Sequence, residues 1–314
     1  MALPLAPPVL PQLARPAAAL PAGDGYAFEP KYDGFRAIVF VDGAQAVLQS
    51  RNGKPLTRYF PELAFPAGRY VLDGEIVIHA PGGGEEFNLL GQRIHPAASR
   101  VARLAAETPA TFIAFDLLAE DDEVLMELPW RERRARLEAR ELGAVELTPV
   151  VDTADAATGW LRTAEGVIAK LLEAPYRPGE RTGMLKIKRK RTLDAVVMGW
   201  RPGKAEGTVG ALILGAYAAD GRLREIGHSS GFKAAEKREL VGRLEPYETG
   251  RRGSGEPSRW TGARDLEWIA LRPELVVEVT FDHASDGRIR HGAKVQRWRE
   301  DKPPRECSTD QLDQ

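Results

Sequence analysis

The sequence has 314 residues, of which 43% are hydrophobic and 28% are charged, a composition typical of an ordinary soluble protein. At roughly 150 residues per domain, this length predicts two domains. The formal net charge of −1 excludes an argument for nucleic-acid binding from overall charge, so such an argument must rest on local basic patches. The single cysteine, Cys307, excludes an internal disulfide framework and indicates a reducing cytoplasm.

The N-terminal segment, residues 1–23, is rich in Ala, Leu and Pro, and prolines interrupt its apolar runs. Its first cation is Arg15, so it lacks the early basic region of a signal peptide. No apolar run in the chain has the length of a transmembrane helix. We therefore predict an extended arm that lies against the first domain, and no contact with a membrane.

Residues 29–36 read Glu-Pro-Lys-Tyr-Asp-Gly-Phe-Arg. The Asp33-Gly34 pair favours a turn, because Gly accepts a positive φ and Asp tolerates it. Apolar alternation resumes at Phe35, so Lys31 is predicted on a loop that enters a strand. For a lone lysine, the ordinary interpretation of this pattern is a solvated loop residue.

A lysine that acts as a nucleophile must first lose its proton. At an ordinary pKa of about 10.4, this loss costs roughly 4 to 5 kcal/mol near pH 7. Neighbouring cations lower the cost because they disfavour the ammonium form. The segment 184–191 contains such cations, and Lys186 and Lys188 alternate with apolar residues, so both are predicted on one face of a strand. An exposed edge strand would also show this alternation.

Carboxylates interrupt two apolar strands. Asp73 and Glu75 lie in the middle of the strand predicted at 70–78, and buried carboxylates are costly unless they pair or bind something. Residues 165–170 are predicted as another short strand, with Glu165 and Lys170 as a charge at each end. The two carboxylates in the middle of the strand at 70–78 favour a functional role over simple packing.

The remaining elements complete the predicted fold. A helix from Pro129 to about Leu142 is rich in Arg and Glu, and we expect its charges to form a solvated face. From Thr192 onward, the sequence predicts one helix, a mobile loop and several short strands: helix 234–244, loop 249–264, and strands 193–200, 209–218, 223–228 and 274–281. Such a set within about 120 residues suits a small barrel of the kind that binds oligonucleotides.

In chain order, the sequence contains Lys-x-Asp-Gly, Ser-Arg-Asn-Gly, Asp-Gly-Glu, Phe-Asp, Glu-Gly-x-x-x-Lys, Leu-Lys-x-Lys and Arg-x-Asp-Lys. With this ordered set, the chain resembles the ATP-dependent DNA ligases of the covalent nucleotidyltransferase superfamily, and among them the small bacterial, core-only enzymes. The resemblance implies an α+β fold. The N-terminal arm, 1–23, would precede an adenylation (nucleotidyltransferase) domain of antiparallel sheets with flanking helices, 24–191, and a C-terminal OB-fold β-barrel, 192–314.

The resemblance also implies a three-step phosphoryl transfer, in which positioning and charge neutralisation do most of the catalysis. Lys31 attacks the α-phosphate of the co-substrate ATP, releases pyrophosphate and retains AMP. The AMP moves to the 5′-phosphate of a nick in duplex DNA, and the 3′-hydroxyl then displaces it. Mg²⁺ or Mn²⁺ is the expected metal.

Each matching residue takes an expected role from this resemblance. Glu29 accepts a hydrogen bond from the adenine amino group, Phe115 stacks on the base, and Asp33 belongs to the catalytic motif of Lys31. The other roles concern the ribose and nick phosphate (Arg36, Arg51), the metal or other nucleotide contacts (Glu75, Glu165), the α-phosphate (Lys186, Lys188, with Arg181 nearby) and the departing pyrophosphate (Arg299, Asp301, Lys302).

Other classes stay open at this point. An RNA ligase or a GTP-using capping enzyme shares the lysine chemistry, although guanine offers an acceptor to Glu29 where adenine has its amino group. A non-catalytic nucleic-acid-binding module would have no use for the charged motif residues. We expect a monomeric bacterial enzyme of the cytoplasm, associated with the nucleoid when bound to DNA. DNA repair and recombination are its expected pathways, and other repair proteins its candidate partners.

Overall fold

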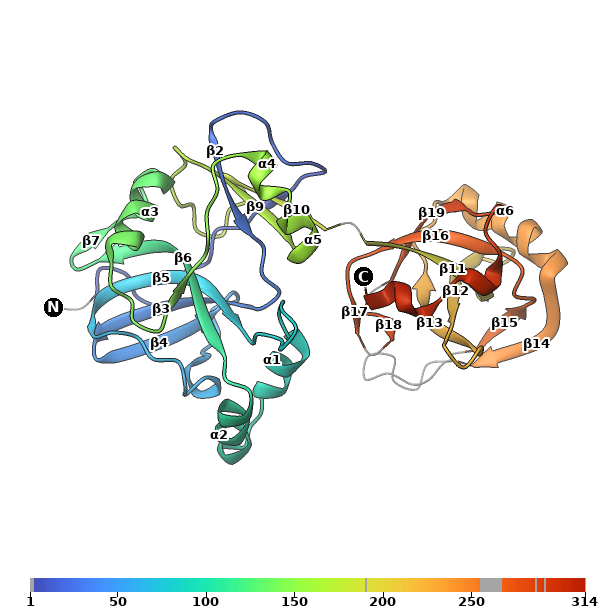
Figure 1. The fold of residues 1–314 in the computed structure, drawn as a ribbon, viewed down its shortest axis with the longest axis horizontal. Helices are drawn as coiled ribbons and strands as arrows, with labels where there is room; N and C mark the ends of the chain where they lie inside the picture. Colours follow the sequence, from blue (N-terminus) through green and yellow to red (C-terminus); the bar gives the residue numbers. More distant parts are fainter. Residues whose placement is uncertain (1–2, 190, 255–266, 286, 291, 314) are drawn as a thin grey trace. The chain divides into compact units, whose positions relative to one another are not determined.

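The computed structural model describes residues 3–189, 191–254, 267–285, 287–290 and 292–313. The chain divides into two compact units, residues 1–189 and residues 190–314, and each unit has its own hydrophobic core (Figure 1). In the part of the chain that the structure describes, no helix is long and apolar enough to span a membrane.

Unit 1 contains a six-stranded and a four-stranded sheet. The six-stranded sheet is built from β4 (Gln45–Ser50), β3 (Phe35–Gly43), β5 (Gly68–Val77), β6 (Thr111–Glu120) and β7 (Glu123–Val124), in this order, with β8 (Glu146–Leu147) beside β6. The four-stranded sheet has the order β1 (Arg15–Pro16), β10 (Met184–Lys188), β9 (Gly166–Leu171) and β2 (Tyr26–Pro30). The β1–β10 and β6–β8 pairs are parallel, and the other pairs are antiparallel.

The helices of unit 1 flank these sheets, as expected (Figure 1). They are α1 (Phe87–Arg93), α2 (Ala98–Glu107), α3 (Trp130–Ala139), α4 (Ala154–Ala157) and α5 (Trp160–Thr163). The 3-10 helix η1 (Thr57–Tyr59) follows β4.

The expectation of a wholly solvated charged face on α3 is wrong. Arg133 is 1% exposed, and its guanidinium pairs with both carboxylate oxygens of Asp116 on β6, at 2.8 and 2.9 Å. Arg134 is also buried and donates to the carbonyl oxygen of Thr148 at 2.9 Å. A buried arginine is tolerated because a carboxylate and carbonyl groups replace its water. Composition alone did not reveal this, since the partners lie on other elements.

In its described residues, unit 2 is a mainly antiparallel sheet unit with one longer helix, α6 (Ala234–Leu244), as the sequence predicted. Its seven-stranded sheet consists of β11 (Arg191–Pro202), β12 (Val209–Tyr217), β13 (Leu223–Ser229), β14 (Glu248–Ser254), β15 (Glu267–Leu271), β16 (Val276–Phe281) and β19 (Lys294–Trp298). The short elements are β17 (Ala284–Ser285), β18 (Arg288–Ile289), η2 (Glu245–Tyr247), η3 (Pro304–Glu306) and η4 (Thr309–Asp313).

The long strand β11 organises this unit. It pairs with β12 along one edge and with β16 and β15 along the other. Within the described residues, the strand pairings of this sheet do not form a closed ring. One isolated parallel bridge joins Ser229, at the end of β13, to Ala293, just before β19. The predicted OB-fold barrel is therefore only partly closed, as this fold permits.

The predicted mobile loop at 249–264 is wrong in its first part, because β14 covers Glu248–Ser254 and pairs with β15. The segment is polar and lacks apolar alternation, so its sequence does not predict a strand. The strand forms because the segment pairs with β15. A Cβ at Gly253 would lie 2.2 Å from the ring of Trp268, which explains why a glycine stands there. The rest of the predicted loop, 255–264, lies outside the described residues.

Candidate active site

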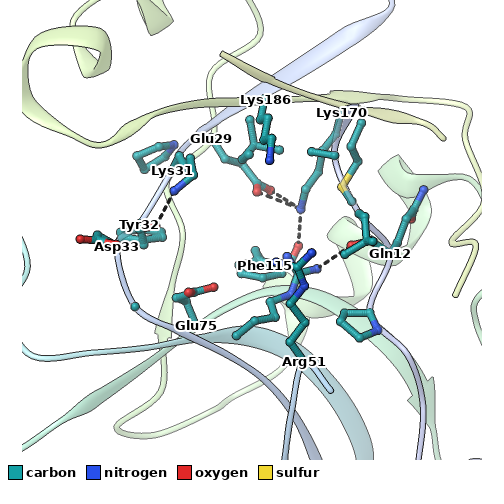
Figure 2. Close-up of a pocket in the computed structure, with 18 of the residues that line it drawn as sticks. Gln12, Glu29, Lys31, Tyr32, Asp33, Arg51, Glu75, Phe115, Lys170 and Lys186 are labelled. Atoms are coloured by element: carbon teal, nitrogen blue, oxygen red, sulfur yellow. Dashed lines mark hydrogen bonds and ion pairs between the residues drawn. The ribbon is translucent and has the colours of Figure 1, made fainter. Parts of the chain in front are cut away.

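A cavity of about 260 Å³ in unit 1 is lined by the N-terminal arm, the loop after β2, and strands of both sheets (Figure 2). Most of the predicted site residues line it: Glu29, Lys31, Asp33, Arg36, Arg51, Glu75, Phe115, Arg181 and Lys186. The structure thus brings together residues that are spread over much of the first unit.

Lys31 directly follows β2, and its backbone N–H donates to the carbonyl oxygen of Gly166 at 2.9 Å. Its Nζ donates to the carbonyl oxygen of Tyr32 at 3.2 Å and lies 3.8 Å from Oε1 of the buried Glu165. The Nζ of Lys188 lies 3.8 Å from the same oxygen. Lys188 and Glu165 therefore join the site through this shared carboxylate, although they do not line the cavity.

A glycine at position 166 allows this arrangement. Its φ is +152°, and a Cβ there would lie 2.2 Å from the carbonyl oxygen of Ile187 on β10. Any other residue would therefore push β9 and β10 apart. The glycine after Glu165 thus keeps this carboxylate beside the lysines of β10.

The cations of the site influence one another. Burial lowers the pKa of Lys186, and Lys188, Lys31, Arg181 and Arg51 lower it further because a second positive charge nearby is unfavourable. Lys186 and Lys188 project from one face of β10, as predicted. Together these residues form a positive region suited to an anion such as a triphosphate.

Glu29 and Lys170 form a buried pair on neighbouring strands, with exposures of 2% and 3% (Figure 2). Nζ of Lys170 is 2.9 Å from Oε1 and 2.8 Å from Oε2 of Glu29, and it also donates to the carbonyl oxygen of Phe115 at 3.0 Å. Burial raises the pKa of Glu29, and Lys170 opposes this rise. The pair therefore keeps a carboxylate at the cavity wall that is available as an acceptor.

Arg36 is held by the fully buried Asp73, whose carboxylate oxygens lie 2.6 Å from Nε and from Nη2. Tyr176 donates its hydroxyl to Oδ2 of the same carboxylate at 2.5 Å. The guanidinium of Arg36 stands 4.4 Å from the ring centre of Phe115. This bidentate pairing satisfies the carboxylate predicted in the middle of β5.

Glu75 lies two residues further along β5, and it is the other carboxylate in this strand. Burial raises its pKa to about 7, while Arg36 and Lys31 pull it down. A Cβ at Gly74 would lie 2.4 Å from the carbonyl oxygen of Ile113, so the Asp-Gly-Glu motif needs glycine for the β5–β6 pairing. The motif thus pairs the carboxylate of Asp73 with Arg36 and places the carboxylate of Glu75 at the cavity.

The predicted residues Arg299, Asp301 and Lys302 lie in unit 2. Arg299 pairs with Asp301 at 2.8 and 2.9 Å and with Asp194 at 2.9 and 3.1 Å. Arg299 holds the pKa of Asp301 at about 2. Nζ of Lys302 is 3.0 Å from Glu306. In the structure, these side chains are thus held by partners within their own unit.

Several residues without a predicted role also lie in or beside the cavity. Lys170 could have been found, because it closes the Glu-Gly-x-x-x-Lys motif. Tyr32 lines the cavity and shares a hydrogen bond of 3.2 Å with Thr148. Gln12 and Tyr176 belong to no motif, and only the fold brings them to Arg36.

Comparisons with known proteins agree with this geometry. The family model described as "ATP dependent DNA ligase domain" matches residues 11–188, and the model described as "ATP dependent DNA ligase C terminal region" matches residues 205–302. The chain is 44% identical over 336 residues to "DNA ligase C1" of Mycolicibacterium smegmatis, with 100% of this chain and 96% of the relative covered. It is also 44% identical over 347 residues to "DNA ligase C" of Mycobacterium tuberculosis, with the same coverage.

Solved structures point in the same direction. A "mycobacterial DNA ligase D complexed with ATP and MES" aligns with a TM-score of 0.53 and 29% identity, over 95% of this chain and 97% of that one. A Lig E DNA ligase, with a TM-score of 0.57 and 19% identity over 92% and 99% of the two chains, shares the fold. The matched models, the full-length relatives and the lysine-centred cavity lead to one conclusion. The chain belongs to the family of ATP-dependent DNA ligases.

Proposed function

We propose that Lys31 is the nucleophile through which this ligase seals nicks in duplex DNA. The observation that carries the proposal is the position of Lys31 at a cavity that is also lined by an adenine-compatible acceptor, Glu29, and by a group of cations. The neutral amine forms a bond to the α-phosphorus of ATP, the bond from that phosphorus to the bridging oxygen breaks, and the nitrogen releases one proton to water. Pyrophosphate leaves, and AMP stays on the lysine.

The remaining residues of the cavity bind and orient the nucleotide. Glu29 accepts from the adenine amino group, and Phe115 packs against the base. Lys186, Arg51 and Arg181 offset the charge of the phosphates, which is the main catalytic contribution in phosphoryl transfer. Arg36, Asp33 and Lys188 complete the set that acts on the ribose, the lysyl-AMP and later the nick phosphate.

A divalent cation, Mg²⁺ or Mn²⁺, fits beside these residues together with the nucleotide. Among the described residues there is no group of three or more His, Cys, Asp or Glu that could hold a metal by protein ligands alone. Mg²⁺ is, however, commonly bound by one or two carboxylates plus substrate phosphates. Glu75 and Glu165 would supply these carboxylates. When bound, the metal would offset phosphate charge.

We further propose that Arg299, Asp301 and Lys302 of unit 2 act on the departing pyrophosphate, and that the basic segment 186–191 contacts the DNA backbone. Lys190 of this segment lies outside the described residues. The proposed cellular setting is DNA repair and recombination in a bacterial cytoplasm, with a monomeric enzyme that binds nicked duplex DNA at the nucleoid and contacts other repair proteins.

The deciding experiment follows the label from ATP to DNA. With ATP labelled at the α-phosphate, the protein should acquire a covalent label, and nicked duplex DNA should then remove it as the strands are joined. Lys31→Ala and Lys31→Arg should both lose the adduct, because arginine keeps the charge but provides no neutral amine. A normal adduct in either variant would place the nucleophile elsewhere, and labelling by GTP alone would support a capping enzyme.

A further inference from the structure

The N-terminal arm runs beside the loop that joins β9 to β10, and residues of both segments line the cavity. Hydrogen bonds join residues 11–14 to residues 179–182, and we call this contact the arm–loop seam. Its bonds run from Gly179 N to Pro11 O (3.3 Å), Leu13 N to Glu180 O (2.8 Å), Gln12 Nε2 to Thr182 O (2.6 Å) and Arg181 Nη1 to Ala14 O (3.5 Å). The arm is therefore a structural wall of the nucleotide cavity.

The loop depends on this seam for its position. Residues 172–183 contain no helix or strand, and Gly179 and Gly183 adopt left-handed backbone conformations with φ of +76° and +69°. The exposed side chain of Arg181, which lines the cavity, is carried by this irregular segment. Contacts with neighbouring segments must therefore hold Arg181 in place, since no regular backbone pairing of the loop itself does so.

Gln12 connects the seam to the hydrogen-bond network of Arg36. It is 2% exposed, and its backbone N–H donates to the Tyr176 hydroxyl at 3.0 Å. Its backbone oxygen accepts from Nη2 of Arg36 at 3.4 Å, while its side-chain amide donates to the oxygen of Thr182. Since Tyr176 and Arg36 both bond to Asp73, one buried glutamine ties the Arg36 network to the loop of Arg181.

We propose that Gln12 is a positioning residue for the phosphate end of ATP, acting through Arg181. The inference rests on the proposed function, because it assumes that Arg181 contacts the triphosphate. Without the side-chain amide, the loop loses one of the four seam bonds, the one at the residue after Arg181, so the guanidinium of Arg181 is less well ordered before ATP binds. Ordering it when ATP binds weakens the binding and leaves the bond-making step, which depends on Lys31, almost unchanged.

The test is single-turnover formation of the labelled adduct over a range of ATP concentrations. Gln12→Met keeps the size of the side chain and removes its donor. It should raise the half-saturating ATP concentration roughly three- to tenfold, the loss expected for one hydrogen bond, with a near-normal maximal rate. Gln12→Leu, which also removes the donor to Thr182 without adding a charge, should behave in the same way and serves if the first variant fails to fold.

Gln49→Met is a matched control, because Gln49 lies on β4 and its side-chain amide holds another point of the same arm, Val9. Gln49 is 1% exposed and bonds to both the N–H and the oxygen of Val9, at 2.9 and 2.6 Å, but it does not line the cavity. This variant should leave the half-saturating ATP concentration within about twofold. An increase equal to that of Gln12→Met would mean that general loosening of the arm is responsible, and the assignment of Gln12 would fall.

The double variant Gln12→Met, Arg181→Ala separates the two remaining explanations. If Gln12 acts through Arg181, the double variant should bind ATP no more weakly than Arg181→Ala alone. Effects that multiply would overturn the inference. A wild-type protein that forms no adduct would instead contradict the proposed function itself, so the two failures are distinguishable.

Discussion

The ammonium of Lys170 and the carboxylate of Glu29 face each other in the wall of the cavity, with Nζ 2.8 and 2.9 Å from the two oxygens (Figure 2). A third contact, to the carbonyl oxygen of Phe115 at 3.0 Å, matches the last of the three N–H donors of a lysine. Lys170 therefore has no donor left for a base, and it opposes the rise that burial causes in the pKa of Glu29. With the proposed role of Glu29 as the acceptor for the adenine amino group, we expect base selection to depend on both residues.

Lys170→Met should weaken the preference for ATP over GTP. Without the cation, burial favours the protonated form of Glu29, and a protonated carboxyl group donates a hydrogen bond where guanine offers an acceptor. Loss of one partner from a buried ion pair should also destabilise the protein by about 3–5 kcal/mol. Adduct formation with each labelled nucleotide, and urea unfolding, measure these two effects.

The double variant Glu29→Gln, Lys170→Met is the control for the stability effect. It removes both charges and should recover much of the stability that Lys170→Met loses, since no charge remains buried without a partner. If the ratio of adduct formation with ATP to adduct formation with GTP were unchanged in Lys170→Met, the lysine would not control how Glu29 distinguishes adenine from guanine.

Glu165→Gln should impair adduct formation severely. The change keeps the size of the side chain and removes the charge that faces Lys31 and Lys188, each 3.8 Å from Oε1. Because we assign Glu165 to the metal as well, the dependence of the rate on Mg²⁺ concentration should shift to higher concentrations. A wild-type rate with a wild-type metal response would remove Glu165 from the metal site.

Glu75 should produce a pH-dependent effect near neutrality. Its pKa rises from 4.5 to about 7 in the folded protein, so the folded state holds a proton that the unfolded state releases. The contribution of Glu75 to stability is therefore full below pH 4.5 and disappears as the pH rises through 7. If the ionised form serves the nucleotide and metal, the rate of adduct formation should increase over the same range.

Unfolding by urea at a series of pH values, in the wild type and in Glu75→Gln, measures the stability effect. The difference between the two proteins should change mainly between pH 4.5 and pH 7 and should level off on either side of this range. Parallel pH profiles of stability for the two proteins would contradict the assigned pKa.

Changing Arg299 and Lys302 together to Ala should abolish adduct formation from ATP. The same variant should still close a nick that already carries a 5′-AMP group, because pyrophosphate has left before that step. Rates of both reactions, measured on the same preparation, provide the comparison. An equal loss in both would assign these residues to DNA binding or to the folding of unit 2.

Binding of nicked duplex DNA should weaken steeply as salt increases. Residues 186–191 hold five cations in six positions, and the binding of such residues to phosphates releases counterions. Replacing Lys188 and Arg189 with Gln should reduce the slope of log affinity against log salt by about 1 for each phosphate that is no longer neutralised. A binding constant that does not change with salt would exclude this segment from the DNA interface.

Short motifs and local periodicity were sufficient to predict much of this protein. The helix at 234–244 and the alternation of Lys186 and Lys188 on β10 follow from spacings within a few residues. The short motifs that begin with Lys31 indicated the ligase family, because they occur in a specific order along the chain. Such features depend on near neighbours, which the sequence displays directly.

Only the tertiary structure decided which distant residues meet. Glu29 and Lys170 are 141 positions apart, and the register of β2 on β9 makes them partners. Arg133 lies in a segment whose composition is typical of a solvated helix, yet its pairing with Asp116 on β6 allows it to be buried. Gln12 carries no sequence signal, and the seam with residues 179–182 gives it a place at the cavity. Burial and pairing depend on strand register and packing, which are set by the whole folded unit.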